Sequence, residues 1–157
     1  MNCKFLSFFC LAALFILTSF SPKKPEIFDS AGIFSCTIND KPYVIHGINA
    51  EMRTVTGGFK QLSLSNDLFT SFFFINPTMR EIELTTAQKR DAIVRYTNPV
   101  NLNLYYPEKG SVRIEVLDEK AKILSGAFEM ELIPKSQSGK KIKITNGKLI
   151  NIPIVYK

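Results

Sequence analysis

The chain has 157 residues, a net charge of +6 and a hydrophobic fraction of 45%. This length fits one domain, and this composition is sufficient for a hydrophobic core. Because the sequence holds a single histidine and three cysteines, it excludes a multi-histidine metal site and a small scaffold stapled by several disulfides.

Residues 1–21 have the layout of a secretory signal peptide. Lys4 precedes an apolar run from Phe5 to Leu17, and small residues follow at Thr18-Ser19. A positive residue, about 7–15 apolar residues and then small residues are the parts of such a signal, whereas a spanning helix needs about 20 apolar residues. We expect a cleaved signal and export to the periplasm, the cell surface or the medium. A retained anchor is the alternative, and it would be the chain's only contact with a membrane.

The cysteines indicate neither a lipid anchor nor a disulfide. Cys10 follows two bulky phenylalanines, which a lipidation signal does not tolerate, and Cys3 lies even earlier. Cleavage would leave only Cys36, which alternates with Phe34 and Ile38 and so shares a strand face with them. We expect it to be a buried small hydrophobic residue.

After a polar, proline-containing tether at 22–30, residues 31–157 are predicted to form a single β-domain. Apolar and polar residues alternate in short runs between turn residues, the pattern of antiparallel strands. The predicted turns are Asn39-Asp40-Lys41, Gly57-Gly58, Asn66-Asp67, Asp118-Glu119-Lys120 and Asn146-Gly147. Asn146-Gly147 is typical of a two-residue hairpin, and Pro153 indicates that the last strand ends on an edge.

Two segments of the domain stand out. Residues 68–75 (LFTSFFFI) are apolar on both faces, so we expect a central strand that is also covered on its outer side. Residues 78–91 fit two interpretations. Thr78 and Glu81 could form a capping box that begins a helix, while Ile82 and Leu84 suit a strand.

About ten strands and no long amphipathic helix predict an all-β fold. We expect an antiparallel up-and-down barrel of roughly 8–10 strands, with a β-sandwich as the alternative. No internal repeat and no second domain are visible in the sequence.

Two parts of the sequence resemble a known family. The C-terminal third contains Gly110-Ser111-Val112, Ser125-Gly126-Ala127-Phe128 and the segment KITNGK at 143–148, and the opening contains INDKP at 38–42. These segments resemble those of exported bacterial proteins of unknown function that are described as lipocalin-like. The resemblance implies a calycin-like β-domain and transfers no catalytic residue. Unlike many members of that family, this chain lacks a lipid-acceptor cysteine after its signal.

No residue set in the sequence predicts catalysis, a cofactor or a metal site. His46 is the only histidine and sits in a predicted strand. The carboxylate pairs Glu81/Glu83 and Glu129/Glu131 are spaced to share one strand face, opposite the apolar residues, so we expect them in solvent. The late lysines are interpreted as a solvated face, because no aromatic residue between 140 and 148 could stack a nucleic-acid base.

Aromatic residues give the only candidate site. Phe72, Phe74, Tyr105 and Phe128 are predicted to point into the barrel. Our first hypothesis is therefore a non-enzymatic module that takes a small hydrophobic ligand in its interior or open mouth. The alternative is a structural or interaction protein of the cell envelope that binds an envelope component through its surface.

Overall fold

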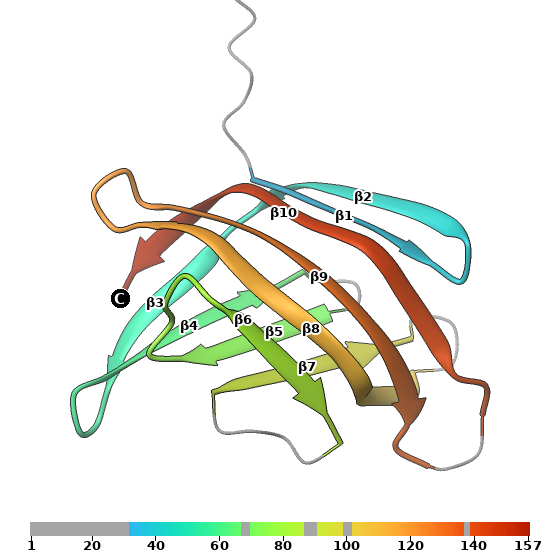
Figure 1. Ribbon diagram of the computed structural model, residues 1–157. Coiled ribbons are helices and arrows are strands. Elements are labelled where there is room, and N and C mark those ends of the chain that lie inside the picture. Colours follow the sequence, from blue (N-terminus) through green and yellow to red (C-terminus); the bar gives the residue numbers. More distant parts are fainter. Residues whose placement is uncertain (1–31, 67–69, 87–90, 99–101, 137–138) are drawn as a thin grey trace, which may run out of the picture.

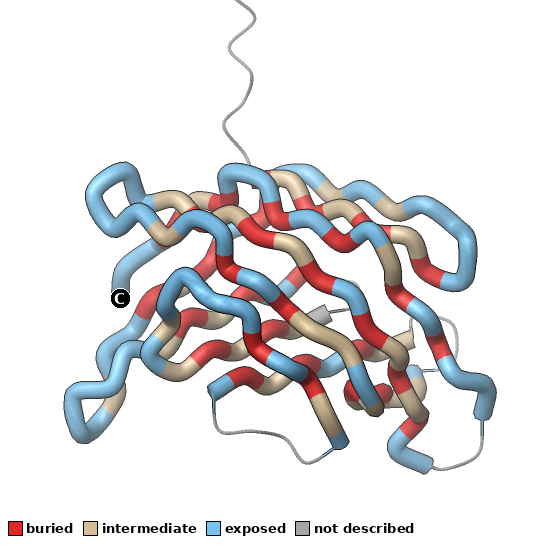
Figure 2. Tube along the Cα trace, in the orientation of Figure 1, coloured by how far each residue is buried: buried red, intermediate tan, exposed pale blue. Residues whose placement is uncertain are grey.

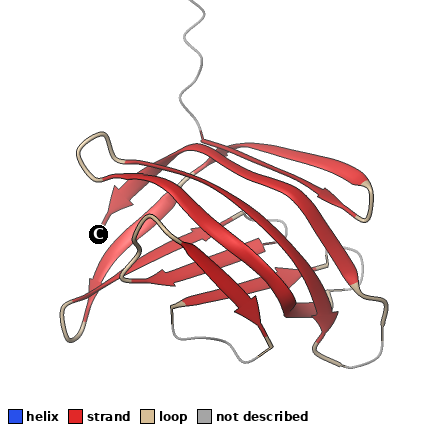
Figure 3. Ribbon diagram, viewed as in Figure 1, coloured by secondary structure: helices blue, strands red, loops and turns tan. Residues whose placement is uncertain are grey.

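A computed structural model describes residues 32–66, 70–86, 91–98, 102–136 and 139–157. The predicted signal segment and tether lie outside the described residues. Within the described part every regular element is a strand (Figure 3). The strands are β1 (Gly32–Ile38), β2 (Lys41–Ile48), β3 (Ala50–Val55), β4 (Phe59–Ser65), β5 (Thr70–Ile75), β6 (Glu81–Thr85), β7 (Ala92–Thr97), β8 (Leu104–Asp118), β9 (Ile123–Pro134) and β10 (Ile142–Tyr156).

The predicted barrel is confirmed, as a closed ring of seven strands with three further strands attached. Around the ring the order is β10-β3-β4-β5-β7-β8-β9, and β9 pairs with β10 again. All pairs are antiparallel except β10–β3 at Ile154–Tyr156. This exception follows from the odd number of strands, because strands that alternate in direction can close such a ring only through one parallel pair.

The three further strands extend the barrel wall. β1 continues from β10 and carries β2 at its outer edge, while β6 pairs with β8. The chain therefore departs from a simple up-and-down order at β6. This strand follows β5 in the sequence, but β5 pairs with β7 instead. In Figure 1, β1, β2, β8, β9 and β10 form the upper layer, and β3, β4, β5 and β7 form the lower layer.

The core lies between these two layers. Buried and exposed residues alternate along the strands, as Figure 2 shows, because successive side chains of a strand point to opposite faces. The centre holds what we call the phenylalanine cluster, formed by Phe34, Phe72, Phe74 and Phe128, all at most 4% exposed.

The predicted hairpin at Asn146-Gly147 is wrong, because β10 runs straight through it as a 15-residue strand. Asn146 has φ 53°, and β10 uses one more residue here than either neighbouring strand. This is a β-bulge, and the same Asn-Gly preference for positive φ that suits a hairpin turn serves it. A second shift against β9 lies at Asn151, with φ 48°.

The prediction that Pro153 marks an edge is wrong. This residue pairs with Ile123 of β9, and the residues that follow it pair with β3. It lies two residues after Asn151, close to the register shift between β10 and β9, and proline inside a sheet is typically found near such bulges.

The other turn predictions hold where the structure describes them. Asn39 and Asp40 both have positive φ and join β1 to β2, and Gly57 and Gly58 do the same between β3 and β4. For residues 78–91 the strand interpretation is correct and the helix is wrong, because β6 occupies Glu81–Thr85. Residues 87–90 lie outside the described part.

β5 is central, as predicted, between β4 and β7. Phe72 and Phe74 face the core and are 0% exposed. Phe73 and Ile75 face outward and are half-buried, so the outer side of the strand is not fully covered.

Candidate ligand site at the barrel mouth

Three of the four predicted interior residues meet in the phenylalanine cluster. The Phe72 ring centre lies 5.1 Å from that of Phe128 and 6.2 Å from that of Phe74. Phe34 completes the cluster, with its centre 5.2 Å from that of Phe128. These separations are those of rings in direct contact. The cluster therefore fills this part of the interior as packed core.

Tyr105, the fourth predicted residue, lies away from the cluster. It packs edge-on against Tyr96, with ring centres 5.9 Å apart, because β7 and β8 pair these two residues directly. Both tyrosines line a pocket of about 290 Å³, which we call the mouth pocket. Its lining residues are Ile38, Asn39, Lys41, Tyr43, Tyr96, Asn98, Tyr105, Lys140, Lys141 and Ile142.

The mouth pocket is lined by residues at which several strands end or begin, and these strand ends lie on the right-hand side of Figure 1. β1 ends at Ile38, β2 begins at Lys41, and β10 begins at Ile142. Side chains at the strand ends gather outside the packed core. The mouth of a barrel is therefore a favourable place for a ligand.

One wall of the mouth pocket is fixed by an asparagine. The backbone N–H of Asn39 donates to the carbonyl of Lys143 at 2.9 Å. In return, the backbone N–H of Lys143 donates to Asn39 Oδ1, also at 2.9 Å. This pair of bonds holds the β1–β2 turn against β10.

The opposite wall is held by the connection from β7 to β8. The N–H of Asn98 donates to the Asn103 carbonyl at 2.9 Å, and the N–H of Leu102 donates to the Asn98 carbonyl at 2.8 Å. Beside it, the Tyr105 hydroxyl lies close to Gly139. Hydrogen bonds of the main chain and of the Asn39 side chain therefore hold the two walls.

The pocket carries positive charge at its rim. Lys141 is neutralised by Glu108, with Nζ and Oε2 2.5 Å apart. Lys41 and Lys140 are exposed and form no ion pair with any residue that the structure describes. Two lysines therefore remain to attract an anionic group.

The floor is apolar with phenol groups set into it. Ile38 and Ile142 are 7% and 5% exposed, and Tyr43 is half-buried. Burial raises the pKa of Tyr96 above its usual 10.0, and neighbouring Tyr43, Tyr105 and Cys36 raise it further. The Tyr96 phenol thus stays neutral near physiological pH and keeps its O–H as a donor.

The sequence pointed to Tyr105 but not to the rest of this pocket. Lys41 and Tyr43 belong to β2, Tyr96 belongs to β7, and Lys140 and Lys141 directly precede β10, so only the strand pairing brings them to one end of the barrel. A cue was present for Tyr43, which closely follows the predicted turn at residues 39–41.

Other candidates considered from the sequence lie outside this pocket. Glu81, Glu83 and Glu129 are exposed on the outer face, and Glu131 pairs with Lys109 at 3.2 Å. His46 is an exposed residue of β2.

Cys36 is buried and free, as predicted. Its side chain is 5% exposed, and burial raises the pKa of its thiol from 9.0 to about 11. It therefore packs as a small hydrophobic residue.

Among the described residues, no group of three or more His, Cys, Asp and Glu side chains is placed to hold a metal ion. The same residues contain no helix long and apolar enough to cross a membrane.

Comparisons with protein-family models, with curated proteins and with solved structures found no match. The function is therefore argued from the site itself.

Proposed function

We propose that this chain is an exported, non-enzymatic binding module of lipocalin-like type. Its mouth pocket would take a small molecule that has an apolar or aromatic body and an acidic group. The layout of residues 1–21 supports export, and the closed seven-strand barrel supports the lipocalin-like assignment.

The observation that carries this proposal is the composition of the mouth pocket. Three tyrosines and two isoleucines offer an apolar and aromatic surface, and Lys41 and Lys140 stand at its rim. Binding sites of this kind combine a mainly apolar lining with a few polar groups that fix the orientation of the ligand. The acidic group would face the lysines while the body of the ligand lies on the tyrosine rings.

The filled interior supports placing the ligand at the mouth instead of the centre. Phe72 is completely buried and its ring touches those of its neighbours. A ligand at the centre would have to displace these rings, which costs packing energy. A pocket of about 290 Å³ is at the small end of ligand sites, so we expect a compact ligand and not a long chain.

The test is a fluorescence titration with anilinonaphthalene sulfonate, which has an aromatic body and an anionic group. The chain contains no Trp, so the probe can be followed without interference from indole. We expect saturable binding to the wild type, displaced by small aromatic carboxylates. The charge-reversing variant Lys41→Glu/Lys140→Glu should bind about tenfold more weakly.

A matched control comes from the β8–β9 turn on the other side of the barrel. Lys120→Glu/Lys122→Glu changes the same net charge far from the mouth pocket, so it should leave probe affinity within about twofold of wild type. Equal weakening in both variants would mean that the probe senses only overall charge, and the proposed site would be wrong.

A further inference from the structure

The outer face of the lower layer holds a second hollow, distinct from the mouth pocket. It has a volume of about 520 Å³ and lies over β3, β4 and β5 beside the end of β10. We call it the outer groove. Its lining residues are Asn49, Glu51, Arg53, Ser63, Ser65, Phe73, Val155 and Lys157.

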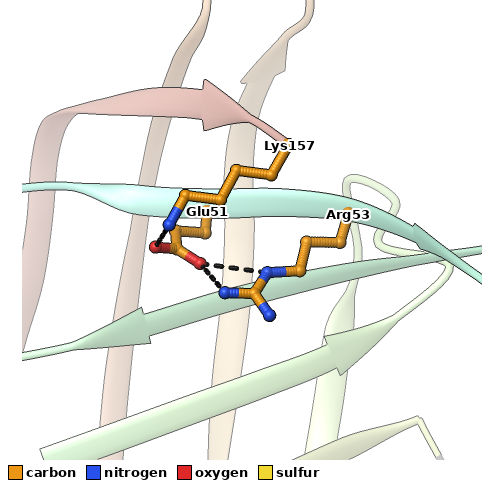
Figure 4. A network of polar contacts seen from close by, with 3 residues as sticks. All are labelled: Glu51, Arg53 and Lys157. Carbon is orange, nitrogen blue, oxygen red and sulfur yellow. Dashed lines mark hydrogen bonds and ion pairs between the residues drawn. The ribbon is translucent and has the colours of Figure 1, made fainter.

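A fixed ionic network forms one side of the outer groove (Figure 4). Glu51 Oε2 accepts from Arg53 Nε at 3.1 Å and from Arg53 Nη2 at 2.5 Å. Glu51 Oε1 accepts from Lys157 Nζ at 2.5 Å. Two cationic side chains thus contact one carboxylate side chain.

The network leaves hydrogen-bond donors pointing to solvent. A guanidinium has five N–H groups and an ammonium has three, while Glu51 uses two of the first and one of the second. The side chains of Arg53 and Lys157 are 54% and 53% exposed. They are therefore held in place by Glu51 and still able to bind a second anionic group.

The rest of the outer groove is lined by two serines, Asn49, Phe73 and Val155. Ser63 and Phe73 are directly paired across β4 and β5, and both face outward. In the next row Ser65, Ser71 and Arg95 follow one another across β4, β5 and β7. Arg95 lies outside the lining of the outer groove, one strand further along the sheet than Phe73, so an arginine flanks the groove on the β7 side as Arg53 does on the β3 side.

We infer that the outer groove binds an acidic polysaccharide whose sugar rings carry carboxylates. Such a chain offers a C–H face for Phe73, hydroxyl groups for Ser63 and Ser65, and carboxylates for Arg53 and Arg95. A wholly apolar partner would leave the serine hydroxyls and the free N–H groups without water or a partner, at a cost in free energy. The inference does not depend on the proposed function of the mouth pocket.

The experiment is a titration of the full chain with a short oligogalacturonate, followed by amide chemical shifts, with a neutral glucan oligomer of similar length as the comparison. We expect saturable shifts at Ser63, Ser65 and Phe73 with the acidic oligomer alone, weakening as salt is added. Binding by the neutral oligomer with equal affinity would overturn the inference, as would shifts confined to the mouth pocket or no shifts at all.

Two variants test the residues named. Phe73→Ala and Arg53→Gln should each weaken oligogalacturonate binding about fivefold to tenfold, while Lys41→Glu/Lys140→Glu at the mouth should not. Arg53 is exposed, so Arg53→Gln remains informative should Phe73→Ala fold poorly. A wild-type dimer that Phe73→Ala makes monomeric, without oligogalacturonate binding by either protein, would assign this face to a second copy and overturn the inference.

Discussion

Asn39 and Lys143 hold each other through two reciprocal hydrogen bonds of 2.9 Å, between residues 104 positions apart in the sequence. Asn76 and Lys60 repeat the arrangement at another place in the sheet. There the Asn76 N–H donates to the Lys60 carbonyl at 2.7 Å, and Asn76 Oδ1 accepts from the Lys60 N–H at 3.0 Å. Both asparagines have φ 46°, a conformation that asparagine tolerates better than most residues.

Substitutions at Asn39 and Asn76 form a matched pair that tests the role of Asn39 in the mouth pocket. Asn39→Gly and Asn76→Gly both keep the positive φ accessible but remove the side-chain acceptor, so each should cost about 1 kcal/mol of unfolding free energy in urea. Only Asn39→Gly should also weaken binding of the anionic probe, because only Asn39 lines the mouth pocket. Asn39→Asp retains the side-chain acceptor, so it should be more stable than Asn39→Gly and close to the wild type. Equal effects of the two glycine variants on probe binding would show that Asn39 has no special place at the mouth.

Gly147 is predicted to be required for steric reasons. A Cβ there would lie 2.4 Å from the Phe128 carbonyl oxygen and 2.5 Å from the Phe128 ring. Gly147→Ala must therefore shift the ring or the strand, and we expect a loss of about 2–3 kcal/mol.

Gly58→Ala is the control for conformation alone, since its Cβ would meet nothing within 4 Å but its φ is 78°. It should cost about 1 kcal/mol. Urea denaturation compares the two glycines, and a smaller loss for Gly147→Ala than for Gly58→Ala would contradict the packing described around Phe128.

The thiol of Cys36 should be unreactive until the protein unfolds. Burial raises its pKa from 9.0 to about 11, so at pH 8 the thiolate fraction is about a hundredfold smaller than in an exposed thiol, and a buried side chain is also hard to reach. In a Cys3→Ser/Cys10→Ser chain, where Cys36 is the remaining thiol, labelling with a disulfide reagent should follow the urea unfolding curve. Rapid labelling of the native protein would contradict the burial of Cys36.

The same shift predicts a loss of stability at high pH. Between the unfolded and folded pKa values the unfolded chain has released the Cys36 proton and the folded chain has not, so stability falls as the pH rises. The slope should approach about 1.4 kcal/mol per pH unit in that window. Cys36→Ala should remove this part of the pH dependence, and an unchanged alkaline slope in that variant would contradict it.

The Glu51 network predicts a carboxyl group that titrates late as the pH falls. The hydrogen bond from Lys157, followed by that from Arg53, lowers the pKa of Glu51 below its usual 4.5. Its contribution to stability is therefore present above the unfolded pKa and is lost as the pH falls through the folded one. Carboxyl carbon chemical shifts can follow this titration directly.

Matched variants separate the two partners of Glu51. Lys157→Met and Arg53→Met should each raise the pKa of Glu51 toward its usual value, because each removes one hydrogen-bonded cation. A carboxyl that titrates at its usual value in the wild type would mean that the network of Figure 4 does not persist in solution.

The alternation of apolar and polar residues predicts most of the strands and their buried faces correctly. Phe128, Met130 and Leu132 do share a buried face, because period-two spacing in a strand leaves little choice once one side is covered. Asn39-Asp40 was read correctly as a turn because both residues tolerate positive φ. Asn146-Gly147 has the same local chemistry but forms a β-bulge, because β10 pairs with β1 and β9 on both sides of it.

The mouth pocket shows the same limit. Tyr105 was singled out as an aromatic residue that faces inward, and it does, yet its neighbour Tyr96 is set by the β7–β8 pairing. Lys41 and Lys140 come to the same rim although 99 positions separate them in the sequence. The pattern along one strand does not predict which residues of other strands line the same pocket. That depends on how the ring of strands closes.

The central claim, that the mouth pocket carries a small acidic ligand, is tested most directly by native mass spectrometry. The protein would be purified from the cells that make it and measured under native and denaturing conditions, as wild type and as Lys41→Glu/Lys140→Glu. The account predicts one small-molecule mass on the native wild type that is released on denaturation and is absent from the variant. Identical native and denatured masses for the wild type, or a small-molecule mass that persists on the mouth variant, would contradict it.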